Sequence, residues 1–404
     1  MKYIVVLIDG AGDDRLESLG GRTPLMAADM PTVRLLEKRA QIGLVKTVPE
    51  GMTPGSDIAN LSVMGYDPRI YHTGRSPLEA LSIGLDMKED DVSLRMNLVT
   101  LKGEGAFSEL VMADYSGGEI SSEESAILVE ALAEAWAGEK GFEIHHGVSY
   151  RHIYLWHKGS LDVSLTPPHN ITGEVISSYL PEGANSEFFR AFLIKGYEIL
   201  RNHPVNLARI AQGKAPANCP WLWGEGKKPR MEDFRKLNGL SGGVISAVDL
   251  LRGMARGAGM AVIPVEGATG TIHTNFKGKG EEGLKALKGG LDYLYVHLEA
   301  PDECGHQRDA DCKVRSLELI DRHILKTLTE GLAGEDFRLL LVPDHRTPIA
   351  TGKHDAVPVP YLLYDSRKDL GQGLTYDEAA ATGGIPVDSG VSLHRLLLEK
   401  EVTR

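Results

Sequence analysis

Short runs of apolar residues alternate with segments of helical spacing at both ends of the chain. Nearly continuous apolar strands separated by helices are typical of a parallel sheet with helices on both faces. The runs expected to form strands are 3–8, 43–48, Met260–Val265, Tyr293–Leu298, Leu339–Val342 and Tyr361–Tyr364. The segments expected to form helices are Met30–Arg39, Ile58–Met64, Val244–Arg256 and Lys313–Gly331.

The middle of the chain shows another pattern, with strand-like runs typical of a mixed or antiparallel sheet. These runs are Leu94–Leu101, Ala106–Val111 and His152–Trp156. Helical patterns at Ser122–Trp136 and Ser186–Asn202 separate them, and His203–Asn238 has little periodicity and is expected to be rich in loops.

We therefore predict an α/β protein of two domains. One is built from residues 1–73 and 240–404. The other is a smaller α/β domain inserted at residues 74–239. The length of 404 residues, with 42% hydrophobic and 25% charged residues, is sufficient for two domains with cores of their own.

The net charge of −12 argues against nucleic acid or an anionic membrane surface as a partner. A small anionic substrate stays possible, because a local group of arginine and lysine side chains can bind phosphate in an acidic protein. The apolar run at the N-terminus is too short for a membrane span, and no later segment reaches the roughly 20 apolar residues that a span requires.

The three cysteines, Cys219, Cys304 and Cys312, form no CxxC pair. A disulfide framework is therefore not expected. The cysteine pattern predicts a reducing compartment, the cytoplasm. Cys304 could serve as a soft metal ligand, although a small buried side chain is the more common role for such a residue.

Carboxylates and imidazoles gather in one C-terminal segment and recur at the end of the first apolar run. They are Asp9, Asp302, His306, Asp344, His345 and His354. Asp9, Asp302 and Asp344 each follow a predicted strand, and active sites of parallel sheets lie beyond the carboxyl ends of the strands. Such donors suit a pair of divalent cations, so the pattern predicts metal-assisted chemistry on an oxyanion.

Ser56 follows the turn formed by Pro54 and Gly55 and opens a predicted helix. On this motif alone, the common role is an N-cap. The alternative is a nucleophile, activated by a metal and by the helix N-terminus, where a phosphoserine would be bound. No GxSxG or Walker A motif is present, which disfavours an α/β-hydrolase and a P-loop kinase.

A set of basic side chains could bind an anionic substrate, because arginine pairs with phosphate or carboxylate through two hydrogen bonds. For any single member a surface role is the more common one. Arg95 and Arg151 adjoin predicted strands, which favours positions in a cleft. The set is Arg75, Arg95, Arg151, His152 and Lys279.

Longer motifs run in order through nearly the whole chain. They include IDGAGD, PGSDIANLSVMGYDP, TGRSPLEALSIGL, GGVISAVDLLRG, VEGATGTIHTNFKGK, YVHLEAPDECGHQRD and KHDAVPVPY. With these motifs the chain resembles the archaeal-type cofactor-independent phosphoglycerate mutases of the alkaline phosphatase superfamily. The resemblance implies an alkaline-phosphatase-like parallel sheet sandwiched by helices, with an inserted substrate domain.

The resemblance also implies two divalent cations and no 2,3-bisphosphoglycerate. Mn²⁺ is expected, with Zn²⁺ or Mg²⁺ as alternatives.

When the functional residues of the family are matched to this sequence one by one, the resemblance implies that Ser56 is the phosphorylated nucleophile. One cation would be bound by Asp9, Ser56, Asp344 and His345, and the other by Asp302, His306 and His354. The basic set would bind the substrate. The chain departs from the family pattern at Asn60, where many archaeal members have histidine, and at Asn170 and His273, where aspartate is usual.

The activity implied is the interconversion of 3-phosphoglycerate and 2-phosphoglycerate by a monomer or small homo-oligomer. Several departures lie near the expected substrate positions. A second hypothesis is therefore a related phosphotransferase such as homoserine kinase, or a metal-dependent phosphatase. A third is a non-catalytic protein that binds a metal or metabolite.

Overall fold

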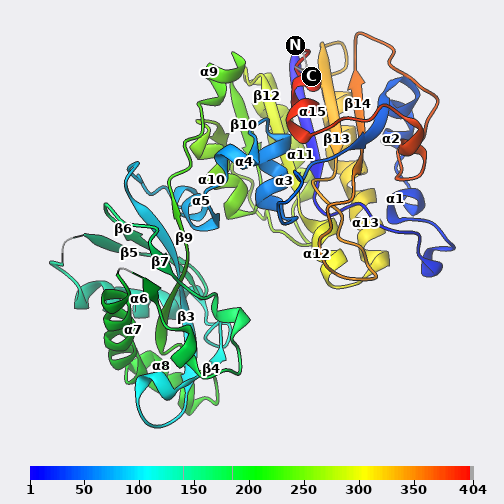
Figure 1. Cartoon of the computed structure of the whole chain (residues 1–404). Coiled ribbons are helices and arrows are strands. Elements are labelled where there is room, and N and C mark those ends of the chain that lie inside the picture. The colour runs from blue at the N-terminus through cyan, green and yellow to red at the C-terminus, as the bar shows by residue number, and fades with distance from the viewer. Residues whose placement is uncertain (140, 184, 401–404) are drawn as a thin grey trace. The chain divides into compact units, whose positions relative to one another are not determined.

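The computed structural model describes residues 1–139, 141–183 and 185–400, and these residues divide into two compact units (Figure 1). Unit 1 comprises Met1–His72 and the described residues from Arg230 onward, and unit 2 comprises Thr73–Pro229. Helix α9 (Phe234–Asn238) belongs to unit 1, whereas the sequence pattern placed these residues in a loop-rich part of the insert. Phe234 packs on Tyr293 of unit 1, with ring centroids 4.7 Å apart.

Unit 1 is built on a sheet with the strand order β11-β10-β12-β1-β13-β14-β2. Strand β1 (Lys2–Ile8) pairs in parallel with β12 (Tyr293–Leu298) on one side and with β13 (Phe337–Val342) on the other. The predicted parallel sheet is confirmed, except that β14 runs antiparallel to both of its neighbours. The remaining strands are β2 (Gln41–Val45), β10 (Gly242–Ile245), β11 (Ala261–Val262) and β14 (Val359–Asp365).

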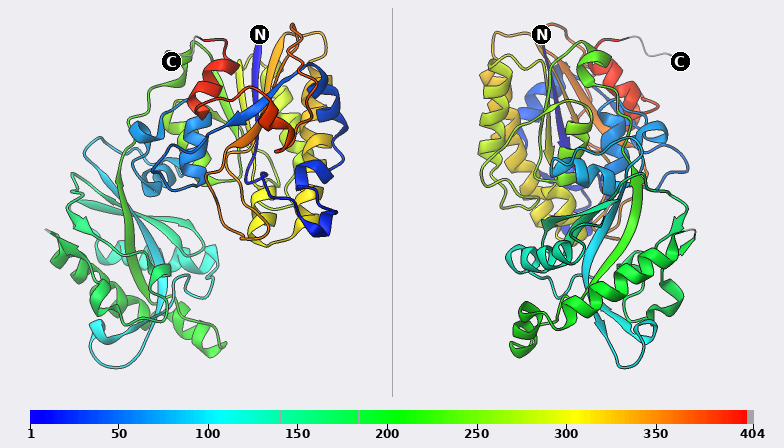
Figure 2. Two further views of the ribbon diagram at one scale, coloured as in Figure 1. Left: turned by 45° about the vertical axis from the view of Figure 1, so that its right-hand side comes forward. Right: turned by 90° about the vertical axis from the view of Figure 1, so that its left-hand side faces the viewer.

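Helices cover both faces of this sheet, as the right-hand view of Figure 2 shows. In β1, Ile4, Val6 and Ile8 join the core beneath one layer of helices, so the alternate residues Val5 and Leu7 face the other layer. The first layer contains α1 (Pro24–Ala27), α2 (Pro31–Leu36), α11 (Phe276–Lys288), α13 (Ala310–Ile320) and α14 (Lys326–Gly331). The second contains α3 (Ser56–Val63), α10 (Asp249–Gly257) and α15 (Gly390–Leu397).

Two element predictions in unit 1 were wrong in part. The expected helix Val244–Arg256 begins only at Asp249, because residues up to Ile245 form strand β10, in which Val244 pairs with Tyr295 of β12. The expected strand Met260–Val265 shortens to β11, which pairs only with the short β10.

Unit 2 is an antiparallel sheet whose centre is the long strand β3 (Val92–Lys102). On one edge β3 pairs with β6 (Arg151–Trp156), and on the other with β9 (Cys219–Lys227). The last residues of β3 also pair with β4 (Val111–Asp114). Strand β5 (Phe142–Val148) completes a hairpin with β6. The main helices are α5 (Arg75–Ser82), α6 (Ser122–Ala135), α7 (Ser186–Arg201) and α8 (Pro204–Ala211).

Two predictions for unit 2 also need correction. The run Ala106–Val111 is mostly a short 3₁₀ turn (η3, Phe107–Glu109) that leads into β4. Strand β9 lies inside the stretch that was expected to be loops. The prediction missed it because the proline and glycines of β9 interrupt the alternation that is typical of a strand. No helix among the described residues combines the length and apolar character needed to cross a membrane.

Candidate metal and nucleophile site

The three aspartates that follow predicted strands lie at the carboxyl ends of neighbouring strands. Asp9 follows β1, Asp344 lies just beyond β13, and Asp302 stands in the first turn of α12 (Ala300–His306), which follows β12. Because β12, β1 and β13 are adjacent and parallel, their ends meet at one edge of the sheet. All three carboxylates are buried, so this edge concentrates negative charge inside the protein.

Ser56 is the first residue of α3, and its hydroxyl points to the same edge. Its Oγ lies 3.3 Å from Oδ2 of Asp9 and 3.2 Å from Nε2 of His345. The N-cap position belongs to Gly55, and no side chain caps the helix. The structure therefore does not give Ser56 the simple capping role that its motif allowed.

One group of metal-type donors consists of Asp9, Asp344 and His345, whose ligand atoms all lie within 4.8 Å of one another. Nε2 of His345 is 3.5 Å from Oδ1 of Asp9 and 3.3 Å from Oδ2 of Asp344. Oδ1 of Asp9 is buried without a hydrogen-bond partner. Such an oxygen is unfavourable unless something binds it, so this group fits a divalent cation.

A second group consists of Asp302, His345 and His354, again with donor atoms within 4.8 Å. His306 adjoins it, because its Nε2 lies 3.2 Å from Oδ2 of Asp302 and 2.9 Å from Nε2 of His354. The Nδ1 of His306 bonds the carbonyl oxygen of Gly352 at 2.9 Å, which directs Nε2 toward the group. His345 belongs to both groups, and its ring stacks on that of His354 with centroids 3.9 Å apart.

The clustering of carboxylates changes their proton affinities. Burial and the charges of Asp344 and Asp302 raise the pKa of Asp9 well above its usual value. Burial also opposes ionisation of Asp302, but hydrogen bonds from His306 and His354 prevail and lower its pKa. A positive ion among these groups would relieve the repulsion that the aspartates impose on one another.

Lys279, from the basic set, lies in unit 1 on α11. Its Nζ is buried and lies 3.4 Å from the carbonyl oxygen of His297. Burial lowers the pKa of Lys279 to about 8, while Glu299 opposes this shift. A buried lysine near the carboxyl end of β12 could bind an anion, and this role stays a prediction.

The other four basic residues belong to unit 2. Arg95 stacks on Trp223, with 4.5 Å between the guanidinium carbon and the ring centroid, and it forms an ion pair with Glu79. His152 is buried, accepts a hydrogen bond at Nδ1 from a backbone N–H, and has a pKa lowered to about 3 by burial. Arg75 and Arg151 are exposed. Their substrate roles stay predictions.

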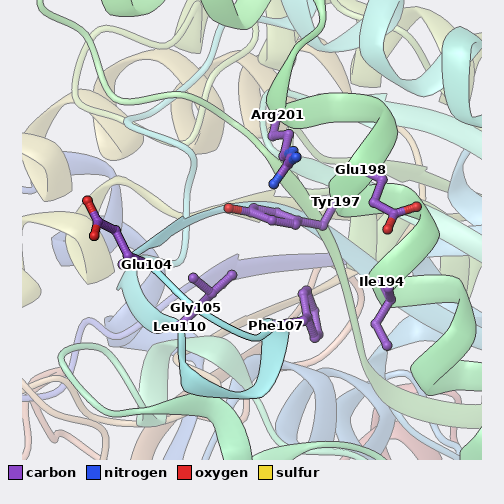
Figure 3. Close-up of a pocket in the computed structure, with 9 residues that line it drawn as sticks. Glu104, Gly105, Phe107, Leu110, Ile194, Tyr197, Glu198 and Arg201 are labelled. Carbon is purple, nitrogen blue, oxygen red and sulfur yellow. The ribbon is translucent and has the colours of Figure 1, made fainter.

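A hollow of about 440 Å³ in unit 2 lies between the turn after β3 and helix α7 (Figure 3). Phe107 and Tyr197 line it with their ring centroids 5.6 Å apart, and Arg201 lies over the tyrosine ring. None of the basic candidates lines it, so this hollow gives their expected role no support.

The chain is similar to known proteins over nearly its whole length. A family model for 2,3-bisphosphoglycerate-independent phosphoglycerate mutase matches residues 38–206. A protein of Geobacter sulfurreducens described as a probable mutase of this kind is 44% identical over 99% of this chain and 100% of its own. A mutase of Methanothrix thermoacetophila is 45% identical, with 98% and 100% covered. The chain belongs to the 2,3-bisphosphoglycerate-independent phosphoglycerate mutase family.

Solved structures show that the whole fold is shared. A protein of Pyrococcus horikoshii has a TM-score of 0.82 at 25% identity and covers 100% of this chain and 99% of its own. A cofactor-independent phosphoglycerate mutase of Thermoplasma acidophilum has a TM-score of 0.70 at 24% identity, with 99% of both chains covered.

Sequence reasoning missed several supporting residues in this family member. Nε2 of His297 lies 2.7 Å from Oδ2 of Asp9, and its other ring nitrogen lies 3.2 Å from the Ser246 hydroxyl. The side chain of Thr347 bonds Oδ1 of Asp302. His297 lies inside strand β12 and Thr347 lies in the loop that follows strand β13, and nothing in the sequence around either residue marks a contact with an aspartate.

Asn60 was noticed only as a departure from the family pattern. It is fully buried on α3, one turn after Ser56. Its side-chain amide donates to Oδ2 of Asp344 at 3.0 Å and to the carbonyl oxygen of Ser56 at 2.9 Å. The Tyr295 hydroxyl donates to the amide oxygen at 2.6 Å, which fixes the orientation of the amide.

Lys313 is a further buried residue, and its replacement by methionine should destabilise unit 1. Its Nζ bonds Oδ2 of Asp13 at 2.8 Å and the carbonyl oxygen of Thr347 at 2.9 Å, and both charged side chains are fully buried. Removing one charge leaves the other unpaired, so we expect a loss of about 3–5 kcal/mol in unfolding free energy. Urea denaturation measures this loss. The double variant K313M/D13N should recover part of it, and equal stability of the single variant and the parent would contradict the expectation.

Proposed function

We propose that the chain interconverts 3-phosphoglycerate and 2-phosphoglycerate through a phosphorylated Ser56, with two divalent cations at the strand ends. The observation that carries the proposal is the position of the Ser56 hydroxyl, within 3.3 Å of both Asp9 and His345, in a chain of this family. A nucleophile at a helix N-terminus, facing a concentrated set of metal-type donors, is suited to phosphoryl transfer.

In this proposal, Asp9, Ser56, Asp344 and His345 bind one cation. Asp302, His306 and His354 bind the other. When bound, the cations would stabilise charge on the phosphoryl oxygens and favour ionisation of the serine hydroxyl. Mn²⁺ suits this mixture of carboxylates and imidazoles, with Zn²⁺ and Mg²⁺ as the alternatives. No 2,3-bisphosphoglycerate is required.

The residues of the chain perform the remaining steps. As the Oγ–phosphorus bond forms and the substrate oxygen–phosphorus bond breaks, Oδ2 of Asp9 holds the proton of Ser56 and returns it to the leaving oxygen. The second hydroxyl of the glycerate then attacks the phosphoserine, and Asp9 holds its proton until the serine oxygen leaves and takes it back. His297 keeps the Asp9 carboxylate oriented throughout.

Substrate anions would be bound by the basic set. The buried Lys279 stands near the carboxyl end of β12, and its positive charge would favour a carboxylate or phosphate. On unit 2, Arg95 is held rigid by Trp223 and Glu79, which favours a defined bidentate contact. Arg75, Arg151 and His152 complete the proposed set.

Removal of cations tests the proposal. After dialysis against EDTA, the full-length protein should lose formation of 2-phosphoglycerate from 3-phosphoglycerate by about 10³-fold or more, and added Mn²⁺ should restore it. A coupled enolase assay measures the rate, and heat-treated enzyme provides the control. Unchanged turnover after complete cation removal would overturn the proposed site.

The alternatives differ only in the phosphoryl acceptor. No contact in the site favours homoserine or water over glycerate, and family membership favours the mutase. The same relationship argues against a non-catalytic binding protein. A panel that offers glycerate, homoserine and water to the phosphorylated enzyme distinguishes them. We further propose a cytoplasmic enzyme, either a monomer or a small homo-oligomer.

A further inference from the structure

Cys304 and Cys312 face each other across the hairpin of helices α12 and α13. Their sulfur atoms are 2.7 Å apart, which is well inside the usual contact distance of two thiols. The sulfur atoms of a disulfide are about 2.05 Å apart, so a movement of less than about 1 Å would join them. We propose that these two cysteines are an oxidisable dithiol that closes reversibly to a disulfide.

The backbone of the hairpin holds the two thiols together. Asp309 donates its N–H to the carbonyl oxygen of Cys304, and its Oδ1 accepts from the N–H of Cys312, both at 2.9 Å. Arg308, just before it, has a positive φ of 58°, which reverses the chain direction between the helices. The turn therefore holds the main chain of the two cysteines close together, and in this arrangement their sulfur atoms meet.

The two thiols differ in access. Cys312 is partly exposed and Cys304 is 2% exposed, so a hydroperoxide reaches Cys312 first. The Cys312 sulfur attacks one peroxide oxygen and the oxygen–oxygen bond breaks. The departing hydroxide takes the thiol proton and leaves as water, and a sulfenic acid remains. Cys304 then attacks that sulfur, the sulfur–oxygen bond breaks, and water leaves. Two thiols thus give up two electrons, and one hydrogen peroxide becomes two waters.

The disulfide would connect elements that bear the proposed cation site. Cys304 stands on α12 between Asp302 and His306. Cys312 precedes Lys313, whose Nζ bonds the carbonyl oxygen of Thr347. Closing the pair would draw together the helix that carries two ligands and the helix that anchors Thr347. We expect a lower turnover in the oxidised form. This consequence rests on the proposed mutase function, whereas the disulfide does not.

The experiment uses the full-length, cation-loaded, reduced protein and an equimolar amount of hydrogen peroxide. Trypsin can cleave after Arg308, which lies between the two cysteines, so non-reducing mass spectrometry should find two peptides joined by one disulfide. The fully buried Cys219 should stay a thiol and serves as an internal control. Turnover should fall about fivefold to tenfold and recover with dithiothreitol. The C312S variant should have the parent's basal turnover and keep it in peroxide.

The outcomes are distinct. A Cys312 sulfinic acid without a cross-link, or two unreacted thiols, would contradict the proposal that the pair forms a disulfide, whatever the turnover of the enzyme. A cross-link with unchanged turnover would overturn the coupling to the site. An equal loss of turnover in C312S would assign the loss to another residue and overturn the coupling as well. Because Cys312 is partly exposed, its replacement should leave folding intact, and C312A provides a second variant.

Discussion

Replacing Ser56 by alanine should reduce mutase turnover by about 10⁴-fold or more, because the proposed reaction passes through a covalent bond to its oxygen. Among the described residues, no other hydroxyl bonds both Asp9 and His345. Steady-state kinetics in the forward direction measure the loss. Mass spectrometry of acid-quenched enzyme should find phosphate on the peptide that contains Ser56 in the parent and none in the variant.

Ser62 offers a matched control on the same helix. Its Oγ is buried and has no hydrogen-bond partner, so S62A removes a hydroxyl from α3 without breaking a contact. We expect S62A to keep the parent turnover within about twofold and to bind cations normally. If S56A kept substantial turnover, phosphoryl transfer would not pass through this serine, although the cation site could still be correct.

The sequence predicted the centre of the fold because its signals there are local. The runs around Ile4 and Leu339 are apolar without interruption, and His297 alone interrupts the run around Leu294, as suits strands buried on both faces. The aspartates at the ends of these strands could be brought together by topology alone, since neighbouring parallel strands end at the same edge.

The supporting residues could not be predicted in this way, because their partners are distant in the chain. Asn60 bonds a hydroxyl 235 positions away, and His297 bonds a carboxylate 288 positions away. In the sequence, Asn60 is a polar residue inside a helix and His297 a single imidazole inside an apolar strand, and both patterns are commonly structural. Strand β10 was hidden for another reason, since its two glycines lack the side chains that would give strand alternation.

Replacing Asn60 by leucine, which has a similar size, should weaken cation binding at the Asp344 group by about 10- to 100-fold. Asp344 Oδ1 already accepts from two backbone N–H groups, of Gly10 and His345, so Asn60 is the side chain that orients the second oxygen. Without it that carboxylate can turn, and the Tyr295 hydroxyl loses its partner. Isothermal titration with Mn²⁺ measures the affinity directly, and turnover at saturating Mn²⁺ should fall less than turnover at limiting Mn²⁺.

The variant Tyr295→Phe tests whether the orientation of the Asn60 amide or its hydrogen bond to Asp344 matters more for cation binding. This variant keeps the Asn60 amide and its bond to Asp344, and removes only the hydroxyl that fixes the amide at 2.6 Å. Its loss of cation affinity should therefore be smaller than that of N60L. If N60L bound Mn²⁺ as tightly as the parent while its thermal unfolding shifted, Asn60 would act only in packing. If Y295F had the larger effect, the contact of Asn60 with Asp344 would not be the one that matters. Which of the two variants loses more cation affinity therefore decides whether the Asn60 amide orients the Asp344 carboxylate for the metal.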